Sequence, residues 1–191
     1  HLTEHYLVCR GGTTTAQTHA YTVDGTLQVF SSQEAMAPFI QLRHRTNDTP
    51  VILPDDGVVL TEKLASLLDI QPGDTITLDG DTRVEVRVAD VTEHYIQHYV
   101  YMTDAYYQSV FGTEPEQNLV LADYPVDVPE TEDLERELVS LDGVTSLTRV
   151  EDTRETYGSS LESVDYAVVL IIVCAAALAF VVLYNLTNIN I

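Results

Sequence analysis

Two histidines are the residues whose types and spacing most directly suggest chemistry. His94 and His98 lie four positions apart, so on a helix they would share a face and could hold a transition metal. The residues around them predict an extended segment from Val91 to Tyr101 instead. In a strand, residues four apart lie about 13 Å from each other, which is too far for two ligands of one ion. We therefore predict no metal and no other cofactor.

The usual nucleophile and phosphate motifs are absent from the sequence. Neither Cys9 nor any serine stands in a G-x-S-x-G or papain-like setting. There is no G-x-x-x-x-G-K-[ST] loop, and Lys63 is the single lysine. The sequence therefore predicts no catalytic residue and no enzymatic activity of its own.

Tyrosines gather in one part of the chain. Five of the 11 tyrosines lie within 13 residues: Tyr95, Tyr99, Tyr101, Tyr106 and Tyr107. Tyrosine presents a large amphipathic surface at a low entropic cost, so an exposed cluster would suit a peptide, a lipid or a partner protein. In strand geometry the first three share one face. The alternative is that this face packs into the core.

The elements that must position these residues begin with strands. Residues 1–30 are rich in strand formers, and Asp24-Gly25 predicts a hairpin turn within them. Ser31 and Glu34 have the spacing of a capping box and predict a short helix, which Pro38 should kink or end within two turns.

A second group of elements follows from Asp56. It comprises a strand at Val58 to Leu60, a helix capped by Thr61 with Leu64, Leu67 and Leu68 on one face, and a hairpin of Ile76 to Leu78 with Val84 to Val88. A further helix is predicted to be capped by Thr103, to end at Phe111 and to have Gly112 as its left-handed stop. The remaining outer segment predicts a βαβ-like unit: a strand at Leu119 to Leu121, a helix bearing Leu134, Leu138 and Leu141, and a returning strand from Val144 to Val150.

The C-terminal part of the chain differs from the rest in composition. From Ala167 to Leu183 the residues are apolar without interruption, and Tyr166 and Tyr184 bracket the run. The length approaches the roughly 20 residues that cross a bilayer, and tyrosines suit both interfaces. We predict a transmembrane helix over residues 166–187, with 188–191 starting a cytoplasmic segment.

Small and polar residues in this helix predict contacts with other helices. Ala175 and Ala179 are four apart and let a neighbouring helix approach closely. Asn185 and Asn188 share one side and could donate hydrogen bonds to a neighbour. We expect a multi-span bundle or a dimer.

The distribution of charged residues indicates how the chain is oriented in the membrane and excludes one class of partner. The chain has 30 acidic and 9 basic residues, a formal net charge of −21, and no charged residue follows Asp165. Nucleic-acid binding needs a basic surface, so we exclude it. We expect residues 1–165 to lie outside the cytoplasm, without a disulfide, and an upstream segment to bring them across the membrane.

Three stretches together resemble the FtsX/MacB-like permease family of ABC transporters. They are DDGVVLTEKLASLLDIQPGDTITL (Asp55 to Leu78), VADVTEHYIQHYVYMTDAYYQSVFG (Val88 to Gly112) and AFVVLYNLTNINI (Ala179 to Ile191). The resemblance implies an α+β extracytoplasmic domain with two lobes. A β-rich lobe, residues 31–112, would be inserted in a βαβ-like, membrane-proximal lobe of residues 1–30 and 117–150, and one transmembrane helix would follow.

The resemblance also implies a function and partners. The chain would be the permease subunit of a transporter in the cell membrane, with one span before this domain and at least two after the present one. ATP hydrolysis would belong to a separate ABC ATPase subunit, and a second permease copy or a sister permease would complete the complex in the lipid bilayer. The outer domain would bind a peptide or lipid substrate, or a partner, and move as ATP is hydrolysed. The competing interpretation is a single-span surface binding protein or sensor with an acidic ectodomain.

Overall fold

The structure is a computed structural model that describes residues 5–80, 82–94, 97–123 and 131–189. The chain divides into two compact units, His1–Pro125 and Val126–Ile191. Each unit is described by itself. Both strands and helices are present, which confirms the predicted α+β class.

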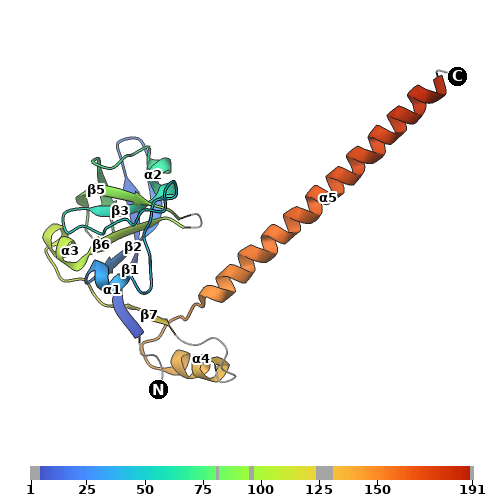
Figure 1. Ribbon diagram of the computed structural model, residues 1–191. Helices are drawn as coiled ribbons and strands as arrows, with labels where there is room; N and C mark the ends of the chain where they lie inside the picture. The colour runs from blue at the N-terminus through green and yellow to red at the C-terminus, as the bar shows by residue number, and fades with distance from the viewer. Residues whose placement is uncertain (1–4, 81, 95–96, 124–130, 190–191) are drawn as a thin grey trace. The chain divides into compact units, whose positions relative to one another are not determined.

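Six strands of the first unit close into a barrel (Figure 1). The strands of this unit are β1 (His5–Gln17), β2 (Thr22–Phe30), β3 (Val58–Thr61), β4 (Thr75–Asp79), β5 (Val84–Thr92), β6 (Tyr99–Thr103) and β7 (Leu119–Asp123). Their order is β2-β6-β3-β5-β4-β1-β7, and β1 also pairs with β2, so the first six form a ring. Closure leaves these strands without the exposed edges of an open sheet.

The two halves of the long strand β1 pair with different strands. Its carboxyl-terminal half pairs antiparallel with β2 and β4, which closes the barrel. Its amino-terminal half pairs antiparallel with β7 over His5–Cys9. Asn118, just before β7, continues this pairing: its side chain accepts a hydrogen bond from the Gly11 amide at 2.7 Å and donates one to the Gly11 carbonyl at 2.8 Å.

Two hydrophobic clusters lie on opposite faces of the strands. The interior cluster fills the barrel and includes Val58, Leu60, Val100 and Met102. The outer cluster includes Val59 and Tyr101 and is covered by parts of the segment 36–53. Because both faces are buried, β3 and β6 are apolar runs rather than alternating ones.

Three short helices belong to this unit: α1 (Gln33–Met36), α2 (Glu62–Leu68) and α3 (Asp104–Phe111). The cap of α1 is Ser32 rather than Ser31, and its hydroxyl accepts a hydrogen bond from the Ala35 amide at 3.2 Å. Leu64 and Leu68 of α2 and the two tyrosines of α3 join the interior cluster, so both helices help to close the barrel core. Gly112 ends α3 in the left-handed conformation (φ 73°), as the sequence predicts.

The turn predicted at Asp24-Gly25 is wrong. Both residues lie inside β2, opposite Thr15 and Thr14, and the chain reverses at Thr18–Tyr21 instead. There the Thr18 hydroxyl accepts hydrogen bonds from the amides of Tyr21 and Ala20 at 3.1 and 3.4 Å. By contrast, the hairpin of β4 and β5 is confirmed by their antiparallel pairing.

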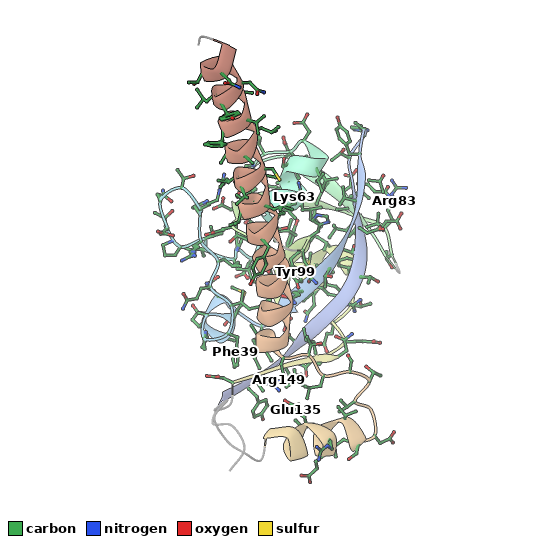
Figure 2. All side chains as sticks on the ribbon, turned by 90° about the vertical axis from the view of Figure 1, so that its right-hand side faces the viewer. Phe39, Lys63, Arg83, Tyr99, Glu135 and Arg149 are labelled. Carbon is green, nitrogen blue, oxygen red and sulfur yellow. The ribbon has the colours of Figure 1, made fainter. Side chains whose placement is uncertain are left out.

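The second unit contains two helices, α4 (Thr131–Ser140) and α5 (Val150–Ile189). The strand predicted from Val144 to Val150 is wrong, because residues 144–149 are irregular and Val150 already begins α5. A strand needs a hydrogen-bonded neighbour, and the described residues offer none to this segment. Arg149, just before α5, instead forms an ion pair with Glu135 of α4 at 3.4 Å (Figure 2).

Helix α5 is unbroken over 40 residues, about 60 Å at 1.5 Å per residue (Figure 1). The part from Tyr166 to Asn188 is long and apolar enough to cross a membrane, and its most apolar 18 residues have a mean hydropathy of 3.0. The predicted span of 166–187 lies within this stretch, and its bounds stay a prediction. About 24 Å of the same helix precedes the span. The proposed division of the outer part into lobes at residues 31 and 112 stays a prediction.

Candidate functional site

The five tyrosines singled out in the sequence do not form one exposed surface. Tyr101, Tyr106 and Tyr107 are buried, with exposed fractions of 3, 9 and 4%. Tyr99 is half-buried, and Tyr95 lies outside the described residues. Tyr106 and Tyr107 belong to the interior cluster, whereas Tyr99 and Tyr101 pack with the outer cluster.

Four aromatic rings of the outer side nevertheless form a continuous row. Phe30 packs against Tyr101 with 6.4 Å between ring centroids, Tyr101 stacks on Tyr99 at 5.7 Å, and Tyr99 meets the edge of His94 at 5.0 Å. We call these four residues the aromatic row. Phe30 is fully buried and Tyr99 is partly exposed, so the row connects the outer core to the surface.

The backbone at the exposed end of the row is held firmly. The His98 carbonyl accepts a hydrogen bond from the Thr26 amide at 2.8 Å, and the Tyr99 amide donates one to the Thr61 hydroxyl at 3.1 Å. The His98 ring nitrogen Nδ1 lies 3.1 Å from the Asp24 carbonyl oxygen. Segments from β2 and the end of β3 therefore fix the backbone position of Tyr99, which Figure 2 labels.

The exposed end is amphipathic and uncharged at neutral pH. Burial lowers the pKa of His94 below its usual value, which favours the neutral ring. Its Nδ1 accepts a hydrogen bond from the Gln97 amide at 3.4 Å, so the neutral ring carries its proton on Nε2. The Tyr99 hydroxyl is hydrogen-bonded to the Gln97 side chain. Such a surface can contact an apolar group and still offer hydrogen bonds to a ligand.

His94 and His98 contact different parts of the structure. The first packs against Tyr99 and the second contacts the backbone of β2. Among the described residues, no group of three or more histidine, cysteine and acidic side chains is placed to hold a metal ion.

Cys9 lies in the outer cluster and is 3% exposed. Burial, and secondarily the charge of Asp104, raises its pKa to about 11. A thiol in this state is a poor nucleophile. On the neighbouring position of β1, the Arg10 guanidinium lies 5.0 Å from the centre of the Tyr107 ring, a cation–π contact that the sequence did not indicate.

The residues predicted for helix packing lie on α5 within the candidate span. Ala175 and Ala179 are one turn apart, as are Asn185 and Asn188, and all four are exposed in this single chain. Their contacts with other helices stay a prediction.

Sequence reasoning missed a polar groove of about 650 Å³ on the barrel, lined by residues of β1, β4 and the start of β5. Its members are spread over Gln17, Thr77 and Arg83 to Glu85, so only the pairing of three strands brings them together. No local motif marks them.

No protein-family model matches the chain, and no curated protein matches it. Among solved structures, the chain is similar to the extracellular domain of the noncanonic ABC-type transporter YknZ from Gram-positive bacteria. The TM-score is 0.48 at 18% identity, over 69% of this chain and 70% of that one. It is also similar to the periplasmic region of MacB from Actinobacillus actinomycetemcomitans, with a TM-score of 0.47 at 14% identity, over 82% of this chain and 77% of that one.

Proposed function

We propose that this chain is the extracytoplasmic domain and following transmembrane helix of a permease subunit in an ABC transporter of the FtsX/MacB type. A separate ATPase hydrolyses ATP, and the outer domain binds a substrate or partner and moves during that cycle. The complex contains a second permease copy or a sister permease in the cell membrane.

The observation that carries this proposal is the continuity of α5. One helix runs from Val150 to Ile189 without a break, and its 23 residues from Tyr166 to Asn188 match the length and composition of a bilayer span. A helix of this length transmits a displacement between the membrane and the outer part of the chain, since bending an unbroken helix sharply needs a proline, a bulge or a similar defect. The three resembling stretches, in the same order, support the family.

The aromatic row supports a binding role for the outer domain. Its exposed end, Tyr99 with His94, is rigidly backed by buried rings and presents an uncharged amphipathic surface. A peptide or lipid substrate, or an apolar segment of a partner protein, fits such a surface.

The experiment that tests the proposal is purification of the complete protein through a tag, after expression with the neighbouring genes. We expect a nucleotide-binding subunit to co-purify and to show ATP hydrolysis that depends on the permease. An unrelated membrane protein with the same tag serves as the control. A lone protein with one or two spans and no ATPase would contradict the proposal and favour an independent surface receptor.

A further inference from the structure

The polar groove on the barrel has the features of a small-ligand site. It measures about 650 Å³, within the range of about 300–1,000 Å³ of small-molecule pockets. The side chains that matter for the argument are Gln17, Thr75, Thr77, Arg83, Val84 and Glu85.

The strand register brings the polar members into one row. Gln17 of β1 is opposite Thr77 of β4, and Thr77 is opposite Glu85 of β5. Ile76 and Leu78, the neighbours of Thr77, belong to the barrel core. Because side chains alternate along a strand, Thr77 and its partners face outward into the groove.

The Arg83 guanidinium is positioned to bind an anionic group. Its Nη2 donates a hydrogen bond to the Gln17 side-chain oxygen at 3.1 Å, which positions the guanidinium with a neutral partner. Arg43, Arg45 and Arg87 of the same unit each lie within ion-pair distance of a carboxylate. In the part of the chain that the structure describes, Arg83 has no such carboxylate.

Glu85 supplies the opposite charge two positions away. Both side chains are exposed, and among the described residues they form no ion pair with each other. Arg83 directly precedes β5 and Glu85 is the second residue of that strand, so their Cα atoms are separated by at most about 7 Å. The termini of an extended dipeptide are separated by a similar distance, about 7 Å.

We propose that this groove binds a short zwitterionic peptide, with its carboxylate at Arg83 and its ammonium group at Glu85. The net charge of −21 repels a purely anionic ligand, whereas a zwitterion carries no net charge. The hydroxyls of Thr75 and Thr77 are available to the peptide group, and Val84 offers an alkyl contact. This binding does not depend on an ATPase, so it can fail or succeed independently of the proposed transporter function.

Isothermal titration of the full chain in detergent tests the inference with the dipeptide alanylleucine and two blocked forms. We expect saturable binding of the free dipeptide and at least tenfold weaker binding of the N-acetylated and the C-amidated forms. Arg83→Gln removes the partner of the carboxylate, so the free and the C-amidated dipeptide should bind this variant equally. Glu85→Gln removes the partner of the ammonium group, so the free and the N-acetylated dipeptide should bind that variant equally.

Matched controls come from an exposed ion pair elsewhere on the barrel, Arg45 with Glu62 at 3.1 Å. Arg45→Gln and Glu62→Gln should keep the wild-type affinities and the preference for free termini. No saturable binding of the free dipeptide, equal binding of all three peptides to the wild type, or the same loss in the control variants would each overturn the inference. The blocked peptides test it without any substitution.

Discussion

At the scale of single residues, the close approach of β2 to the residue before β6 constrains what can stand at position 25. A Cβ atom on Gly25 would lie 2.9 Å from the His98 carbonyl oxygen, a contact that real Cβ atoms do not make. The same carbonyl accepts the hydrogen bond of Thr26. Glycine within a strand often marks such an approach of another backbone. Gly25 therefore indirectly supports the position of Tyr99.

We expect Gly25→Ala to lower the free energy of unfolding by about 1–3 kcal/mol, since the added methyl group must push two hydrogen-bonded backbones apart. Gly12→Ala is the matched control, because a Cβ there meets nothing within 4 Å. Pulse proteolysis of the chain in detergent, over a urea series, measures both. Equal stability of the two variants would contradict the close approach.

Cys9 gives a second test at this scale. Its pKa of about 11 leaves only about 0.1% of the thiol ionised at pH 8. We expect the folded chain with Cys174→Ala to resist a thiol reagent at pH 8 and to react at once in concentrated urea. The thiolate becomes abundant only above the raised pKa, so reactivity of the folded chain should rise as the pH approaches 11. Rapid labelling at pH 8 would show that Cys9 is not buried.

At the scale of elements, two threonines in similar sequence positions have different roles. Thr61 and Thr103 each precede a helix, and the sequence predicts both as caps. The Thr103 hydroxyl accepts a hydrogen bond from the Tyr106 amide at 3.2 Å, as a cap does. The Thr61 hydroxyl makes no cap hydrogen bond and accepts the Tyr99 amide instead. This second partner comes from a strand 38 residues away, so local sequence could not reveal it.

We expect Thr103→Ala to lower the free energy of unfolding by about 1 kcal/mol, the usual contribution of an N-cap hydroxyl. Thr103→Ser keeps the hydroxyl and should lower the free energy of unfolding clearly less. Hydrogen exchange of the Tyr106 amide provides a direct readout, and it should accelerate in the alanine variant only. Unchanged exchange in that variant would show that Thr103 does not cap α3.

The elements also show which signals the sequence carries. The hairpin of β4 and β5 and the helices α2 and α3 follow from local alternation, apolar spacing and the glycine that ends α3, so their prediction succeeded. Two details of α2 were wrong, because Thr61 makes no cap hydrogen bond and Leu67 is exposed. The Asp24-Gly25 signal failed because a close tertiary approach, not a turn, requires that glycine. The strand at 144–150 failed because, among the residues that the structure describes, its alternation has no partner strand to pair with.

At the scale of the whole molecule, closure of the barrel could not be predicted from the sequence. It depends on β1 pairing with β4 about 60 residues later, through Thr15 to Gln17, and no local pattern encodes such a pairing. The polar groove is a product of that closure and was missed with it. The candidate span and the acidic composition of the remainder, by contrast, are properties of the sequence itself.

The central claim is that the outer domain moves as a partner subunit hydrolyses ATP. The most direct measurement is the distance between spin labels on Ser66→Cys of α2 and Ser140→Cys of α4, both exposed positions, in the purified complex with Cys174→Ala. A label pair at Ser66 and Glu34, both within the first unit, is the control. The account predicts that a non-hydrolysable ATP analogue shifts the first distance distribution and leaves the second unchanged. An unchanged first distribution in every nucleotide state would contradict it.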